Sequence, residues 1–338
     1  MRVVQITRPG GPEVLDIVEQ AVPAPGPGEV LLEVYAASVN RPDIQQRRGL
    51  YPPPPGLTPI PGLDAAGRVV AVGDGVDTRR VGDMVCALTN GGAYADYVVV
   101  PAVQCMPIPG GLSFIEAASL PEAFFTAWNN IIWLGRLAEG ETLLVQGGSS
   151  GVGMAGMQMA KLLRGARVFA TASSADKRAA CMEMGADAVF DYRRDWATEI
   201  RHHAGEHCLD VALDAQAGPY VQQQLDLMAP DGRLVFIASH QGATAEVNIR
   251  DLVRRRLTLT GSTLRPRSAA YKGRIASALV SAVWPLLEAG RMVTRIHAVL
   301  PLVEVRQAHG LLDANEQLGK VVLAVNAAHA GERPDGVR

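Results

Sequence analysis

The feature that most restricts the fold is a run of glycine and small residues between an apolar stretch and a helical one. Residues 143–145 read as a buried strand, and residues 154–161 read as a helix. The segment between them is Gln146-Gly147-Gly148-Ser149-Ser150-Gly151-Val152-Gly153. It allows a tight turn whose backbone can come close to a pyrophosphate, which the helix N-terminus then faces. A turn that binds nothing can carry the same glycines, but a second apolar stretch at 166–172 favours a dinucleotide-binding unit.

From about residue 121 onward, short apolar stretches alternate with helical ones. The apolar stretches are 142–146, 167–172, 188–192, 210–214, 233–239 and 257–260. Six strands joined by crossover helices predict an α/β fold with a doubly wound parallel sheet.

The regions on either side of this segment have a different pattern. The first 120 residues are rich in Gly, Pro and short β-type stretches, which predicts a partly open barrel or a sandwich. After residue 261 the pattern predicts helices at 275–289 and 302–315. The closing apolar strand, 320–325, has no place in a filled six-stranded sheet, so we expect it to return to the N-terminal domain. Residues 326–338 are predicted to form a loosely ordered tail.

Composition excludes several classes of protein. The net charge of −2 over 338 residues gives no basis for binding nucleic acid, and no apolar stretch approaches the length of a membrane span. The N-terminus reads as a strand without a signal-peptide core, so a cytoplasmic protein is expected. The four cysteines are scattered and read as buried thiols, and His202, His203 and His207 read as surface residues.

Several motifs, in order, carry a family resemblance over nearly the whole chain. They are 10–15, 39–43, 61–67, 92–97, 121–127, the glycine turn and 319–323. The chain resembles the quinone oxidoreductase (zeta-crystallin-like) branch of the medium-chain dehydrogenases/reductases. Within it, residues 48–56 and 264–268 look most like the tumour-suppressor-inducible NADPH quinone reductases. The resemblance implies a GroES-like β-barrel domain (1–121 and 266–338) with an inserted Rossmann domain (122–265).

The residues after the second Rossmann strand indicate the cofactor. An acid about 20 residues beyond the glycine turn binds the ribose 2′-OH of NAD. Here the strand ends in Ala172-Ser173-Ser174, with no acid at that position. Small hydroxyl residues leave room for a 2′-phosphate, and Lys177 or Arg178 can supply its counter-charge, so the sequence predicts NADPH. Asp176 could instead turn inward, and Lys177 could be an ordinary exposed helix residue.

The resemblance also implies that zinc is absent. Alcohol-oxidising relatives bind a catalytic zinc through a Cys and a His-Glu pair, and this chain has Asn40 and Leu63-Asp64 at the matching positions. The chain also runs directly from residues 87–90 to Gly91, without the four-cysteine lobe of those relatives. No tetrahedral N/S ligand set can be assembled, so the acceptor should already be electrophilic.

The resemblance implies further site residues. Asn40, Asp43 and Tyr51 are expected near the nicotinamide and substrate. Tyr51 could hydrogen-bond or stack on a quinone or only pack on the proline loop, and Asp43 could be structural. His240 could donate a proton. The cofactor-binding set implied in addition to the turn and to Ser173 and Lys177 is Thr126, Tyr192, Ser239, His240, Leu264 and Lys320.

The leading hypothesis is therefore a zinc-free NADPH:quinone reductase that acts on a small molecule and binds neither nucleic acid nor membrane. An enoyl or alkenal reductase is the second hypothesis, because the same scaffold reduces activated C=C bonds. A non-catalytic, crystallin-like NADPH-binding protein is the third. A homodimer formed through the Rossmann domains is implied by the resemblance alone.

Overall fold

A computed structural model describes residues 1–334, and the chain divides into two compact units. Unit 1 comprises Met1–Phe125 and the chain from Arg265 onward, and unit 2 comprises Thr126–Leu264. Unit 2 begins at Thr126 rather than at residue 122 as predicted. The N–H of Glu122, near the start of helix α3 (Pro121–Ala127), donates to Asp64 of unit 1 at 2.6 Å, which ties this residue to unit 1.

Unit 2, which lies wholly within the described residues, contains a six-stranded parallel sheet. Its strands are β8 (Thr142–Val145), β9 (Arg167–Thr171), β10 (Ala188–Phe190), β11 (Leu209–Asp214), β12 (Met228–Phe236) and β13 (Thr258–Gly261). Their order is β10-β9-β8-β11-β12-β13, and every pairing is parallel. The predicted doubly wound sheet is confirmed. Successive strands are added on one side of β8 as far as β10, and from β11 onward on its other side, so the strand order reverses between β8 and β11.

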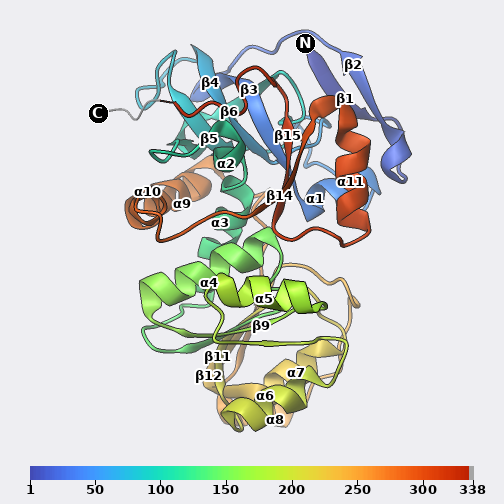
Figure 1. The fold of residues 1–338 in the computed structure, drawn as a ribbon, viewed down its shortest axis with the longest axis vertical. Helices are drawn as coiled ribbons and strands as arrows, with labels where there is room; N and C mark the ends of the chain where they lie inside the picture. Colours follow the sequence, from blue (N-terminus) through green and yellow to red (C-terminus); the bar gives the residue numbers. More distant parts are fainter. Residues whose placement is uncertain (335–338) are drawn as a thin grey trace. The chain divides into compact units, whose positions relative to one another are not determined.

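Helices cover both faces of this sheet (Figure 1). Helices α4 (Gly151–Arg164) and α5 (Ala175–Glu183) lie on one face. Helices α6 (Trp196–Ala204), α7 (Tyr220–Leu227) and α8 (Ile249–Arg255) lie on the other. A π-helical segment, η3 (Trp128–Leu134), precedes β8. Right-handed crossovers produce this two-sided arrangement, because the strand order reverses once.

Unit 1 is built on a seven-stranded sheet within the described part of the chain. Its strands are β3 (Glu29–Val39), β4 (Asp64–Val72), β5 (Met84–Leu88), β6 (Tyr97–Pro101), β7 (Cys105–Pro107), β14 (Ile296–Pro301) and β15 (Lys320–Ala324). The order is β14-β15-β3-β4-β5-β7, and β6 pairs with β3. A hairpin of β1 (Arg2–Ile6) and β2 (Leu15–Glu19) joins it through a bridge between Val3 and Ala95. Strand β15 pairs antiparallel with β3, as predicted for the closing strand.

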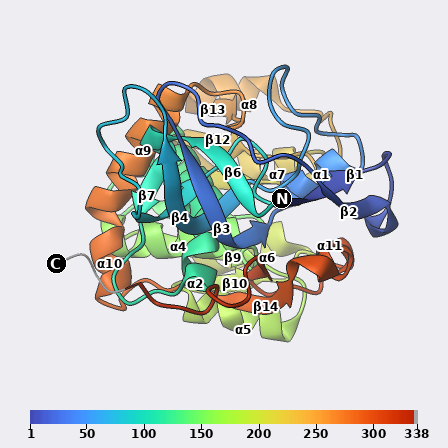
Figure 2. The same ribbon diagram turned by 90° about the horizontal axis from the view of Figure 1, so that it is seen from above.

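Short helices complete unit 1. They are α1 (Arg41–Arg47), α2 (Phe114–Ala118), α3, α9 (Ala269–Ala282), α10 (Trp284–Glu288) and α11 (Val305–Asp313), with 3₁₀ turns η1 (Pro12–Val14), η2 (Ala102–Gln104) and η4 (Leu302–Glu304). Figure 2 shows α9 and α10 along one flank of the strands. The single helix predicted at 275–289 is wrong. Ser268 caps α9 earlier, and Pro285, which has no N–H to continue a helix, starts the separate helix α10.

The predicted loose tail is also wrong for the part that the structure describes. The N–H groups of Phe114 and Ile115 donate to the carbonyls of Glu332 and Ala330, both at 3.1 Å. Ala330 is buried, and the His329 ring stacks on Tyr35 with centroids 4.9 Å apart. Residues 326–332 therefore pack on unit 1, and residues 335–338 lie outside the described part.

Candidate functional site

The glycine turn of unit 2 has a backbone geometry that only glycine allows. Ser150 caps α4, since its Oγ accepts from the Gly153 N–H at 3.0 Å and donates to the Gly147 carbonyl at 2.9 Å. A Cβ on Gly153 would lie 2.6 Å from the Gly148 oxygen, and one on Gly148 would lie 2.7 Å from the Ala170 Cβ. Gly147 has a φ of +83°. The turn therefore brings the backbone of its glycines close together at a helix N-terminus and forms a cradle that fits a dinucleotide pyrophosphate.

The cradle lies where the strand order of the unit 2 sheet reverses. It follows β8, and the strand order reverses between β8 and β11. Ligands of open parallel sheets bind outside the carboxyl ends of the strands at such a point. Because the strands are parallel, the residues that follow β9, β10, β12 and β13 reach the same edge. The structure thus brings Ser173, Tyr192, Ser239, His240 and Leu264 to one edge of unit 2.

The segment after β9 has the features predicted for a phosphate-binding position. The Ser174 Oγ caps α5 by accepting from the Lys177 N–H at 3.2 Å. Lys177 is only 8% exposed, so its reading as an ordinary surface residue is wrong. Asp176 is exposed in the first turn of α5. Asp176, the acid nearest in sequence to the position that binds the ribose 2′-OH of NAD, is therefore exposed to solvent.

Asp191, at the end of β10, is a carboxylate that the sequence reasoning missed at this edge. Its oxygens accept from the Nε, Nη2 and N–H of Arg193 at 2.9, 2.6 and 3.0 Å. They also accept from the Arg178 Nη1 at 3.0 Å. The hydrogen bonds from Arg193 hold the pKa of Asp191 well below its usual range. The motif rule searches for an acid after the second strand, and Asp191 follows the third, so only the sheet order reveals it.

The remaining predicted residues of unit 2 have varied surroundings. Ser239 and His240 are exposed after β12, and the His240 N–H donates to the Ala215 carbonyl at 3.1 Å. Tyr192 is half-buried against the core of unit 2. The Thr126 carbonyl accepts from the Asn130 side chain at 2.7 Å, which ties it to the π-helical segment.

In unit 1, Asn40 belongs to a buried polar network centred on Asp64. Asp64 Oδ2 accepts from the Asn40 Nδ2 at 2.9 Å, from the Lys320 Nζ at 3.1 Å and from the Ser38 hydroxyl. The Lys320 Nζ also donates to the Asn40 Oδ1 at 2.5 Å. Val321 of β15 pairs with Val39 of β3, and this register places Lys320 beside Asn40. An ammonium group therefore lies between the two side chains.

Asp43, predicted near the nicotinamide, instead has a structural position. It is fully buried, and its oxygens accept from the N–H groups of Asn40 and Gly62 at 2.8 and 3.0 Å and from the Tyr94 hydroxyl at 3.2 Å. Burial raises the pKa of Asp43 to about 6. Asp43 therefore completes the capping box of α1 and orients Asn40, which is the structural alternative expected for it from the sequence.

Tyr51 lies beside the buried Arg265, which in turn contacts the buried Lys272. The Arg265 guanidinium lies over the Tyr51 ring at 5.7 Å from its centroid, and its Nη1 donates to Gln46 at 2.8 Å. The Lys272 Nζ donates to the Asn90 Oδ1 at 2.5 Å. Burial, followed by the charge of Arg265, lowers the pKa of Lys272 to about 8. Tyr51 itself is only partly buried and remains accessible to a flat acceptor.

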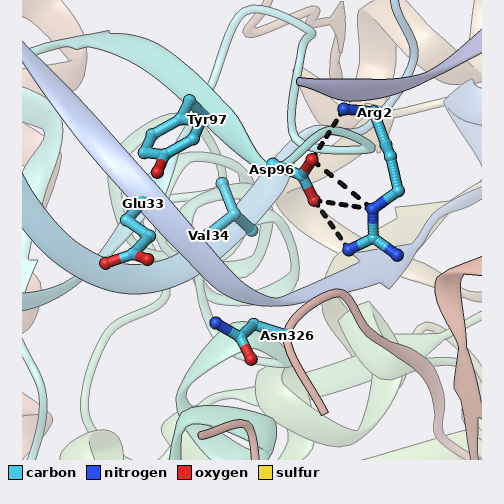
Figure 3. A pocket seen from close by; sticks show the side chains of 6 residues that line it. All are labelled: Arg2, Glu33, Val34, Asp96, Tyr97 and Asn326. Atoms are coloured by element: carbon cyan, nitrogen blue, oxygen red, sulfur yellow. Dashed lines mark hydrogen bonds and ion pairs between the residues drawn. The ribbon is translucent and has the colours of Figure 1, made fainter. Parts of the chain in front are cut away.

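A separate cavity of about 220 Å³ opens on unit 1 (Figure 3). Its lining consists of Arg2, Glu33, Val34, Asp96, Tyr97 and Asn326. The Arg2 and Asp96 side chains pair with each other at 2.7 Å, and Glu33 pairs with Arg68 at 2.8 Å. The charged side chains that line this cavity are therefore neutralised by ion pairs. None of the site residues predicted from the sequence lines the cavity.

The donor set around Asn40 does not fit a zinc ion. Leu63 offers no ligand atom, and both oxygens of Asp64 already accept hydrogen bonds, Oδ1 from the Glu122 N–H and Oδ2 from Asn40 and Lys320. The Lys320 ammonium would also repel a divalent cation at this place. No group of three or more His, Cys, Asp or Glu residues in positions 1–334 is arranged to bind a metal.

Two family models match the chain. The model described as alcohol dehydrogenase GroES-like domain matches residues 26–110, and the one described as zinc-binding dehydrogenase matches residues 151–280. The quinone oxidoreductase of Lama guanicoe is 33% identical, over 96% of this chain and 97% of that protein.

Two solved structures share the fold. One is a mycobacterial protein in complex with NADPH, at a TM-score of 0.85 and 29% identity, covering 96% of this chain and all of that one. The other is the JamJ enoyl reductase, at a TM-score of 0.84 and 26% identity, covering 96% of this chain and 98% of that one. No helix within residues 1–334 is long and apolar enough to cross a membrane.

Proposed function

Because the chain belongs to the quinone oxidoreductase branch of the medium-chain dehydrogenases/reductases, we propose that it reduces quinones with NADPH and without zinc. The observation that carries this proposal is the network of Asn40, Asp64 and Lys320. In this network the Lys320 ammonium occupies the position between Asn40 and Asp64, where alcohol-oxidising relatives bind a catalytic zinc. An enzyme without a Lewis acid is suited to an acceptor that is already electrophilic.

When bound, NADPH would supply a hydride. The chain would contribute position and charge. The cradle of residues 147–153 would hold the pyrophosphate, and Ser173 and Lys177 would lie beside the 2′-phosphate. Thr126, Tyr192, Ser239, His240 and Leu264 are proposed as further cofactor contacts.

The acceptor would meet polar groups of unit 1. Asn40 is proposed to orient it, and Lys320 would stabilise the negative charge that develops on its oxygen, directly or through Asn40. The partly exposed Tyr51 hydroxyl would hydrogen-bond to the carbonyl, and the guanidinium of Arg265 over the ring fixes the position of that ring.

We also propose that the protein is a homodimer, that it is located in the cytoplasm and that its substrate is a small molecule. Strand β13 is the last strand in the order of the unit 2 sheet, so its outer edge is open in the described part of the chain. On the adjacent helix α8, Ile249 and Val253 are exposed. An open edge beside apolar side chains is suited to pairing with a second copy.

The test is oxidation of NADPH and of NADH, compared over a panel of ortho- and para-quinones. We expect turnover with quinones and a higher kcat/KM for NADPH. Absence of turnover with every quinone would contradict the proposal, and tight NADPH binding without turnover of any acceptor would identify a non-catalytic binding protein.

The structural similarity to the JamJ enoyl reductase favours one alternative, reduction of an activated C=C bond. Stereospecific reduction of an enoyl thioester at a higher kcat/KM than any quinone would establish this alternative.

A further inference from the structure

The end of strand β10 carries an arrangement of charges that the proposed function leaves unexplained. Asp191 lies between two arginines, Arg193 and Arg178. Arg193 contacts it through both Nε and Nη2, which fixes the plane of the guanidinium. The Arg193 side chain is nevertheless 59% exposed. A long cationic side chain is thus held in one orientation while its outer face remains accessible.

Arg178 connects this group to strand β9. Its Nη1 donates to the Ser173 carbonyl and to Asp191 Oδ2, both at 3.0 Å. The arginine pair therefore stands beside Ser173, where the 2′-substituent of the adenosine ribose is expected. Arg194, the next residue in sequence, is instead paired with Glu199 at 3.3 Å and does not belong to the group.

Asp191 itself cannot serve as the acid that selects NADH. A carboxylate accepts about four hydrogen bonds. Asp191 already accepts four, three from Arg193 and one from Arg178. Binding a ribose 2′-OH would require one of them to break. The three side chains together carry one net positive charge.

We propose that Asp191 is a positioning residue that, together with Arg178, holds Arg193 toward the 2′-phosphate of the dinucleotide, which makes Arg193 a determinant of NADPH preference. The inference rests on the proposed use of NADPH. By charge alone the Asp191 carboxylate would repel a phosphate, yet the inference gives Asp191 a role in phosphate binding. The sign of the effect of removing that charge is therefore diagnostic.

The experiment is calorimetric titration of the full-length protein with 2′,5′-ADP and with 5′-AMP. For Asp191→Asn we expect the Kd for 2′,5′-ADP to rise about tenfold, the loss typical of one displaced charge-assisted hydrogen bond, while the Kd for 5′-AMP stays the same. Arg193→Gln should produce the same selective loss, and it tests the inference even if Asp191→Asn does not fold.

Asp231→Asn is the matched control. Asp231 also forms two hydrogen bonds with one arginine, Arg256, both at 2.7 Å, but in the first half of β12, away from its carboxyl end. The same charge change there should leave both Kd values unchanged. If Asp191 acts only as an opposing charge, Asp191→Asn will tighten 2′,5′-ADP binding, which would overturn the inference.

The outcomes also separate the two proposals. If the wild-type protein prefers 2′,5′-ADP and both variants keep that preference, the positioning role is wrong and NADPH use stands. If the wild type binds 2′,5′-ADP and 5′-AMP equally, the proposed NADPH preference is wrong, and so is the proposed role of Arg193.

Discussion

Lys320 combines two roles that are separable by experiment, a proposed contribution to catalysis and compensation of a buried carboxylate. The Lys320 and Asp64 side chains are 6% and 0% exposed. We predict that Lys320→Met lowers the free energy of unfolding by about 3–5 kcal/mol, because it leaves the Asp64 charge buried without its counter-ion. Urea denaturation measures this loss.

Lys161→Met is the control for that substitution. Lys161 pairs with Asp187 at 2.6 Å, but the two side chains are 40% and 36% exposed. Exposed pairs contribute at most about 1 kcal/mol, so this variant should remain near the wild type. Equal losses in the two variants would contradict the compensating role of Lys320.

Lys272 predicts a dependence of stability on pH. Its pKa is about 8 in the folded chain, against 10.5 for an unperturbed lysine. Between these values the unfolded state binds more protons, so this residue makes the free energy of unfolding rise as the pH rises from about 8 to 10.5. Lys272→Met should remove that part of the slope, as measured by denaturation at a series of pH values. A slope equal to that of the wild type would contradict the lowered pKa.

The sequence predicted some residues of the candidate site and not others. Motif spacing identified the glycine turn because its requirements are local, namely glycine at fixed offsets before a helix. Asp191 and the position of Lys320 depend on which strands are neighbours. For Asp43 the sequence left a catalytic and a structural role open, because it does not show that both carboxylate oxygens accept hydrogen bonds from backbone and tyrosine donors.

At the level of elements, the most informative error was the prediction of a loosely ordered tail after β15. Residues 326–332 are small and polar, which is typical of a tail, and their packing depends on contacts with α2 that lie more than 200 positions earlier. The break between α9 and α10 could have been predicted, because proline is tolerated in the first turn of a helix but not in its interior, and Pro285 would lie in the interior of a helix over 275–289.

The packed C-terminal turn can be tested with one substitution at two positions. Ala330 is buried, whereas Ala328 in the same turn is exposed. We predict that Ala330→Glu destabilises the protein by about 2 kcal/mol or more because it buries a charge, and that Ala328→Glu has little effect. Thermal unfolding compares the two. If neither substitution changes the Tm, residues 326–332 do not pack as described.

At the scale of the whole molecule, the sequence predicted the two-part organisation, because the change from short β-type stretches to alternating strands and helices is a composition signal that spans many residues. A composition signal does not show individual contacts near the boundary, such as the hydrogen bond from the Glu122 N–H to Asp64, which ties Glu122 to unit 1.

The proposed dimer belongs to this scale. Ile249 and Val253 are 60% and 66% exposed. We predict that the wild type sediments at twice the 35.9 kDa chain mass and that the Ile249→Asp, Val253→Asp double variant is a monomer. Val81, 64% exposed in unit 1, is the control, and Val81→Asp should remain dimeric. A monomeric wild type would contradict the dimer.

The pairing of β15 with β3 has a consequence for synthesis on the ribosome. Unit 2 is one continuous segment and can fold as soon as residue 264 has emerged, because domains fold as units during translation. Asp64 is made early, yet its counter-ion Lys320 arrives some 250 residues later. Until then the nascent barrel holds a carboxylate without its cation. The chain therefore completes the whole of unit 2 before it has made the residue that neutralises Asp64 in unit 1.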